Sequence, residues 1–91
     1  MPFEIRYHRD VKTADIPLLD AKTKNRIKTA IEMRLTIAPH QFGEPLRKTL
    51  KGYWKLRIGD YRVVFKVVGA EVWILGIMHR KKVYKKIENR I

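Results

Sequence analysis

Basic side chains alternate with apolar ones in the stretch WKLRIGDYRVVF, residues 54–65. Gly59 followed by Asp60 is typical of a two-residue type II′ turn, which has glycine at its first central position. Counting outward from this turn places Arg57 directly opposite Arg62 on the next strand. Two cations in this position repel each other, at a cost of about 0.2–1 kcal/mol. A bound phosphate would reverse the sign, because each guanidinium can donate two hydrogen bonds to it.

The two faces of this predicted hairpin differ in character because side chains alternate along a strand. One face would be apolar and belong to the core: Trp54, Leu56, Ile58, Tyr61, Val63 and Phe65. The reverse face would be cationic: Tyr53, Lys55, Arg57, Arg62, Val64 and Lys66. The segment EVWILGIM would add three apolar side chains beside the cations, namely Trp73, Leu75 and Ile77. A fully solvated polar face with splayed side chains is the alternative interpretation.

Local patterns predict the elements that position the hairpin. FEIRY, residues 3–7, alternates as a short strand does, and a helical segment follows that ends near Pro17. A longer helix is predicted next by four apolar residues that recur at helical spacing, namely Ile27, Ala30, Ile31 and Leu35. Asp20 precedes them and is a residue type that caps helix N-termini. Pro39 and Gly43 end that helix. Three strands and a last helix should follow, with one face of that helix formed by Val83, Ile87 and Ile91.

The charge of the chain is large and unevenly distributed. The 91 residues carry a net charge of +12, and residues 47–91 hold +10 of it against +2 in residues 1–46. Such a concentrated field favours a polyanionic partner, which is nucleic acid, an acidic protein or an anionic membrane. The alternative explanation is that the basic residues only keep a small protein soluble. The length and the lack of a spacer predict a single small domain over residues 1–91.

Several classes of protein are disfavoured by composition. The chain has no cysteine, which removes disulfides, thiolate nucleophiles and cysteine-based zinc sites. It has no run of about 18 apolar residues, and its first ten residues lack the apolar segment of a signal peptide. We therefore expect a soluble, cytoplasmic protein that makes no membrane contact.

Two quoted motifs resemble a known family when they are taken together. LKGYWKLRIGDYRVVFKV followed by HRKKVY resembles the RelE/ParE superfamily of bacterial and archaeal toxins, and most of all its RelE branch of ribosome-dependent mRNA endonucleases. The likeness extends over nearly the whole chain, and its specific part is residues 46–84. It implies a small α+β fold, in which a twisted antiparallel sheet packs against two N-terminal helices. It also implies a short C-terminal helix that an antitoxin displaces or covers.

The same resemblance implies a set of site residues around the mRNA: Lys55, Arg57, Arg62, Arg80 and Tyr84. Arg57 departs from the pattern of the family, because lysine is expected there. Since a guanidinium cannot practically act as a base, Lys55 is the better proton acceptor and Arg57 would clamp phosphate. Further lysines would contact ribosomal RNA with little specificity, namely Lys51, Lys66, Lys81, Lys82, Lys85 and Lys86.

RNA carries its own nucleophile, the 2′-hydroxyl group, so the reaction implied needs neither a metal nor another cofactor. Arg62 would stabilise the transition-state charge, Arg80 would lie near the leaving group, and Tyr84 would stack on a base or orient the 2′-hydroxyl. Packing of the last helix is the alternative role for Tyr84. His79 has a suitable pKa for acid–base work, but a lone histidine at a strand end is more often structural.

These observations favour an mRNA interferase toxin that cleaves codons in the ribosomal A site. Its predicted partners are mRNA, the ribosome and an acidic antitoxin of the RelB type or another type, whose binding segment would become ordered on the basic half. A ParE-like gyrase inhibitor with the same fold and no nuclease chemistry is the first alternative. A nonspecific basic nucleic-acid binder or a decayed toxin is the second.

Overall fold

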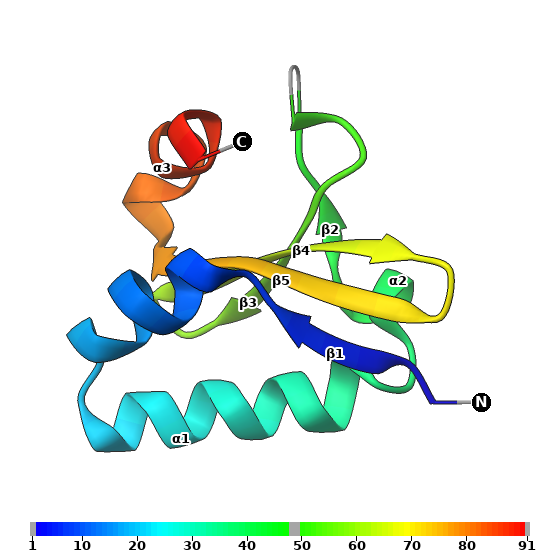
Figure 1. The fold of residues 1–91 in the computed structure, drawn as a ribbon, viewed down its shortest axis with the longest axis horizontal. Coiled ribbons are helices and arrows are strands. Elements are labelled where there is room, and N and C mark those ends of the chain that lie inside the picture. Colours follow the sequence, from blue (N-terminus) through cyan, green and yellow to red (C-terminus); the bar gives the residue numbers. More distant parts are fainter. Residues whose placement is uncertain (1, 48–49, 91) are drawn as a thin grey trace.

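The computed structural model describes residues 2–47 and 50–90 (Figure 1). Its first half holds β1 (Glu4–Tyr7), η1 (Val11–Asp15), η2 (Ile16–Leu18), α1 (Ala21–Ala30), η3 (Ile31–Leu35) and α2 (Pro39–Phe42). Its second half holds β2 (Glu44–Pro45), β3 (Trp54–Ile58), β4 (Tyr61–Val68), β5 (Glu71–His79), η5 (Arg80–Lys82) and α3 (Val83–Arg90). The predicted helix residue Ile91 lies outside the described residues. No helix within these two ranges is both long enough and apolar enough to cross a membrane.

The five strands form one sheet in the order β1-β5-β4-β3-β2, which confirms the α+β class (Figure 1). The pairs β2–β3, β3–β4 and β4–β5 are antiparallel, as expected. The first strand differs, because β1 runs parallel to β5 in the register Glu4↔Glu71 to Tyr7↔Ile74. No hairpin joins these two strands, which are far apart in sequence, so turn geometry does not impose an antiparallel direction on them.

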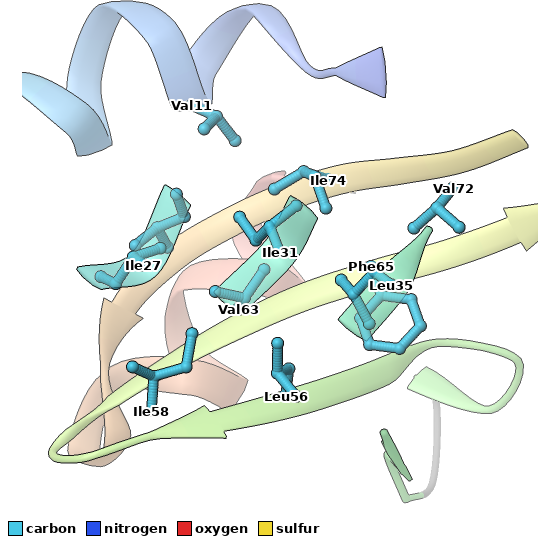
Figure 2. Close-up of a cluster of buried hydrophobic side chains, with 11 residues drawn as sticks. Val11, Ile27, Ile31, Leu35, Leu56, Ile58, Val63, Phe65, Val72 and Ile74 are labelled. Carbon is cyan, nitrogen blue, oxygen red and sulfur yellow. The ribbon is translucent and has the colours of Figure 1, made fainter. Parts of the chain in front are cut away.

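The main core lies between the sheet and the long helical segment formed by α1 and η3 (Figure 2). Asp20 begins this segment as predicted, since its carboxylate accepts a hydrogen bond of 2.7 Å from the backbone N–H of Thr23. The helix contributes Ile27, Ile31 and Leu35, and they pack against buried residues of the sheet, namely Leu56, Ile58, Val63, Phe65, Val72, Ile74 and Ile77.

A second, smaller cluster lies on the opposite face of the sheet. The short helix α3 packs there through Val83 and Ile87, and Figure 1 shows α1 and α3 on opposite sides of the sheet. Their buried partners are Leu46, Leu50, Val64 and Met78. The face that carries the cations is therefore half covered, in agreement with the expectation that it is only partly exposed.

A β-bulge in β5 changes which side chains join the cations. Between β4 and β5 the register shifts, so Val64 pairs with Gly76 and Phe65 with Ile74, and Leu75 has no partner on β4. The expectation that Ile77 lies beside the cations is wrong, because Ile77 pairs with Val63 and is buried in the main core. The extra residue reverses the alternation of side chains along the strand.

The N-terminal side of the bulge keeps the predicted alternation. Trp73 lies on the cationic face as expected, directly opposite Lys66. Beyond the bulge, Met78 takes the place expected for Ile77, since it lies opposite Arg62. Tryptophan and methionine are therefore the apolar neighbours of the cations on β5.

Candidate functional site

The hairpin of β3 and β4 has the register counted from its turn. Ile58 pairs with Tyr61, Arg57 with Arg62, and Lys55 with Val64. Gly59 has φ of 57°, in the left-handed region that its place in a two-residue hairpin turn requires. The two arginines therefore lie side by side on the cationic face.

Arg62 bends back over the turn that precedes it. One of its terminal nitrogens donates hydrogen bonds to the backbone oxygens of Gly59 at 3.0 Å and Tyr61 at 2.9 Å. Two carbonyl oxygens thus fix one edge of the guanidinium and offset part of its repulsion from Arg57. The opposite arginine has a different environment, because Arg57 is exposed on β3 beyond the two residues that pair with β2.

Arg80 and His79 are fixed at the same end of the sheet. The backbone N–H of Arg80 donates a hydrogen bond of 2.8 Å to the carbonyl oxygen of Asp60, which ties the start of η5 to the hairpin turn. The side chain of His79 caps η5, since its Nδ1 accepts a hydrogen bond of 3.2 Å from the N–H of Lys81. This bond gives His79 a structural role and leaves its Nε2 as the nitrogen able to exchange a proton with a ligand.

Lys55 and Tyr84, which are far apart in sequence, line one open pocket of about 460 Å³. Lys55 comes from the middle of β3, and Tyr84 comes from the first turn of α3, where it is 37% exposed. Arg47 and Glu88 complete the lining. The docking of α3 on the sheet therefore brings together two of the residues that the sequence singled out.

Arg57 does not line the pocket that holds Lys55. It lines instead a larger groove of about 790 Å³ between the helical segment of α1 and η3 and the end of β3, with Arg26 and Arg34 on the helical side. The guanidinium of Arg34 lies 5.9 Å from the ring centre of Phe42 in this groove. The cations therefore continue around the edge of the sheet beyond β3.

Two of the six lysines predicted to contact RNA, Lys82 and Lys86, line a separate pocket with Asp15 and His79. Five of the six are exposed and Lys86 is half-buried; the exposed ones are Lys51, Lys66, Lys81, Lys82 and Lys85. Lys66 places its ammonium 5.7 Å from the centre of the Tyr53 ring, at the end of the cationic face away from the turn. The lysines of η5 and α3 follow Arg80 directly in the chain.

Three charged residues at the site were missed from the sequence. Glu44 pairs with Lys55 across β2 and β3, so both side chains project from the same face. Glu88 lies one helical turn after Tyr84, a spacing that places both on one side of α3. Arg47 enters from the segment before β3, and no local pattern would have placed it there.

Metal-ligating side chains are not clustered in the described part of the chain. Within residues 2–47 and 50–90, no group of three or more His, Cys, Asp or Glu side chains is arranged to hold a metal ion. The side chains that line the pocket of Lys55 can provide charge and exchange protons.

The fold and this site can be compared with known families. A family model described as the ParE toxin of type II toxin–antitoxin systems, parDE, matches residues 5–84. This range begins within β1 and contains the other four strands and the start of α3, where Tyr84 lies. The chain therefore belongs to the RelE/ParE superfamily of toxins of type II toxin–antitoxin systems, which confirms the resemblance found in its motifs.

Several of the proteins to which the chain is similar are called RelE. The toxin RelE of Mycobacterium tuberculosis is 41% identical over 49 residues, which are 52% of this chain and 50% of that protein. The matched region thus spans about half the length of that relative. The RelBE2 toxin–antitoxin complex from the same organism contains a chain with a TM-score of 0.81 and 26% identity, covering 88% of this chain and 93% of that one.

A free RelE mutant of Escherichia coli shares the fold at low sequence identity. Its TM-score is 0.75 at 12% identity, and the match covers 99% of this chain and 94% of that one. The arrangement of α1, the sheet and α3 is therefore shared, although most side chains differ.

Proposed function

We propose that this toxin is a ribosome-dependent mRNA endonuclease that cleaves in the A site without a metal ion. The observation that carries the proposal is the pocket in which Lys55 of β3 meets Tyr84 of α3. Arg57 and Arg62 lie opposite each other nearer the hairpin turn and would provide a pair of guanidinium groups for a phosphate. The similarity to the toxin RelE of Mycobacterium tuberculosis supports the same assignment.

The proposed reaction uses the 2′-hydroxyl of the RNA as the nucleophile. A bond forms between O2′ and the adjacent phosphorus while the bond from phosphorus to O5′ breaks, which leaves a 2′,3′-cyclic phosphate and a 5′-hydroxyl. Lys55 accepts the proton of the 2′-hydroxyl, and Arg57 and Arg62 stabilise the charge of the transition state. Tyr84 orients the nucleotide, Arg80 contacts the leaving O5′, and His79 or a water molecule gives O5′ the proton that makes it a hydroxyl.

Glu88 is a second candidate proton acceptor in this pocket. Its carboxylate lines the same space as Lys55, and a carboxylate is an acceptor at neutral pH under ordinary conditions. The contributions of the two groups separate in a comparison of Lys55→Met with Glu88→Gln. The variant that removes the proton acceptor lowers kcat by about 10²–10⁴-fold, the usual value of general acid–base catalysis.

The partner that neutralises this toxin is proposed to be an acidic antitoxin protein. The net charge of +12 supports it, because an acidic segment gains association rate from the opposite field. Solved relatives from Mycobacterium tuberculosis and Methanococcus jannaschii are toxin–antitoxin complexes, the latter a RelB–RelE complex with 21% identity and a TM-score of 0.65. The cytoplasm, where mRNA and ribosomes are found, is the proposed location.

Mapping of mRNA 5′ ends in a translating lysate tests the nuclease directly. We expect new 5′ ends within codons when the purified protein is added, and little cleavage of the same RNA without ribosomes. Arg62→Ala and Arg80→Ala should lower the rate steeply, whereas Lys22→Ala, an exposed cation on α1, should leave it unchanged. Equal cleavage by all three variants would contradict the assignment of the site residues. Efficient cleavage of free RNA would contradict the dependence on ribosomes.

A second candidate function comes from the name of the matching family, ParE. A ParE-like gyrase inhibitor would act by protein contact and would have no need for the pocket of Lys55 and Tyr84. Purified gyrase in a supercoiling assay separates the two functions. Inhibition of supercoiling together with intact mRNA in the lysate would establish this alternative.

A further inference from the structure

The outer edge of β5 is completed by two side chains in place of a strand. β1 pairs with β5 only as far as Ile74, and the last backbone bond on this edge joins His8 N–H to the oxygen of Ile74 at 2.8 Å. Beyond it, the N–H of Ile77 donates to Asp15 Oδ2 at 2.9 Å, and Arg90 Nη1 donates to the oxygen of Leu75 at 3.0 Å. The bulge in β5 thus binds one residue from each end of the chain.

Asp15 and Arg90 also bind each other in a two-pronged ion pair. Arg90 Nη1 lies 2.7 Å from Asp15 Oδ2, and Nη2 lies 3.0 Å from Oδ1. The Asp15 side chain is fully buried and that of Arg90 is 10% exposed. The hydrogen bonds that Arg90 donates to Asp15 raise the pKa of Arg90, while burial acts in the opposite direction. A carboxylate buried so completely is tolerated only because its oxygens are bound, so the pair cannot be opened without cost.

This pair lies at the far end of the helix that carries Tyr84. α3 has eight residues, and helices of that length are marginal without tertiary contacts. Its apolar anchors are Val83 and Ile87, which lie four residues apart and so along one side of the helix. Arg90 follows Tyr84 by six residues, so the two side chains point to different sides of the helix. The ion pair holds the β5 side of α3 while Tyr84 faces the pocket of Lys55 on the other.

We propose that Asp15 and Arg90 are positioning residues that set the orientation of Tyr84 at the site. The ion pair fixes the rotation of α3 about its own axis and the position of its C-terminal end. Both determine the direction in which Tyr84 points. Neither residue touches the pocket of Lys55, so their effect passes through the helix. The kinetic part of this inference rests on the proposed nuclease function, and the docking part does not.

Arg90→Lys is the appropriate substitution because it keeps the charge beside Asp15 but loses the two-pronged geometry. We expect kcat for ribosome-dependent cleavage to fall by about 10–100-fold with KM within a factor of about two, since small errors of placement cost rate more than binding. Arg6→Lys is the matched control, because Arg6 forms a partly exposed pair with Glu71 at 3.0 Å and lies away from the pocket. It should leave kcat unchanged.

A double-mutant cycle with Tyr84→Phe and Tyr84→Ala separates positioning from general destabilisation. In the background that lacks the Tyr84 side chain, Arg90→Lys should have almost no further effect on kcat. Equal effects of Arg90→Lys with and without Tyr84, or a loss of stability with unchanged kcat in the folded protein, would overturn the proposal.

Docking of α3 can be measured without any activity, because the chain has no cysteine. Ile87 is fully buried against the sheet, so Ile87→Cys reports undocking by its reaction with a thiol reagent. We expect Arg90→Lys and Asp15→Asn each to raise this rate about tenfold or more over the Ile87→Cys protein alone. An unchanged rate contradicts the proposal even if the wild-type protein cleaves mRNA. A raised rate in a protein that does not cleave mRNA rejects the nuclease and leaves the role of the ion pair in docking α3 intact.

Discussion

Replacing Gly76 by alanine would place a methyl group between the sheet and α3. The new Cβ would lie 2.5 Å from Met78 Cε and 2.7 Å from Ile87 Cδ1, closer than carbon atoms approach. The methionine methyl can rotate away, but Ile87 is fully buried and stiff at χ1, so its Cδ1 has little room to turn and part of the strain falls on the packing of α3. Overpacking lowers the free energy of unfolding by about 1–3 kcal/mol. The lower conformational entropy of the unfolded chain raises it by about 0.4–1 kcal/mol. We expect a net loss of about 1–2 kcal/mol.

Ile87→Val supplies the matched test, because it removes the Cδ1 atom that the new methyl group meets. Alone it should cost about 0.5–1.5 kcal/mol, while in the Gly76→Ala protein it should cost nothing or restore stability. Urea unfolding followed by tryptophan fluorescence measures all four proteins, and the Tm of Gly76→Ala should fall by about 4–16 °C. Additive losses, within about 0.5 kcal/mol, would refute the claim that Gly76 permits the close approach of α3.

Three other perturbations have defined outcomes. The hydrogen bond donated by the Thr23 backbone N–H lowers the pKa of Asp20. The contribution of this bond to folding stability is therefore complete above the unfolded pKa of about 3.9 and is lost as the pH falls through the folded pKa. The Tm difference between wild type and Asp20→Ala should shrink in acid. Gly69 has φ of 59° with open space around it, so Gly69→Ala should cost about 1–2 kcal/mol in urea unfolding and Gly69→Asn less. Lys85→Gln should reduce by about 0.7 the slope of log affinity against log salt for a single-stranded RNA oligonucleotide, measured by fluorescence anisotropy.

The hairpin was predictable residue by residue because its pairing depends on local chemistry. Gly59 and Asp60 mark the turn, and the alternation of side chains then determines every partner from Ile58 back to Trp54. The cap at Asp20 was predictable for the same reason. In both places the decisive interaction joins residues that are near in sequence.

The bulge in β5 was missed although a signal for it exists. A glycine inside a strand pattern often marks a bulge or a close approach of backbone, and Gly76 stands next to Leu75. Strict alternation was assumed instead, and it placed Ile77 on the wrong face. The parallel direction of β1 and the pairing of Asp15 with Arg90 have no such signal, because they depend on how distant parts of the chain pack.

One irregularity in β5 accounts for much of the site. The extra residue at Leu75 turns Ile77 into the core, and in the same segment, beyond the end of β1, Arg90 binds the carbonyl oxygen of Leu75 and Asp15 binds the N–H of Ile77. Gly76, beside it, has no side chain to keep α3 away from the sheet. A regular strand with a larger residue would hold the helix off this face. Tyr84 would then not share a pocket with Lys55, so the candidate site depends on the absence of a side chain at Gly76.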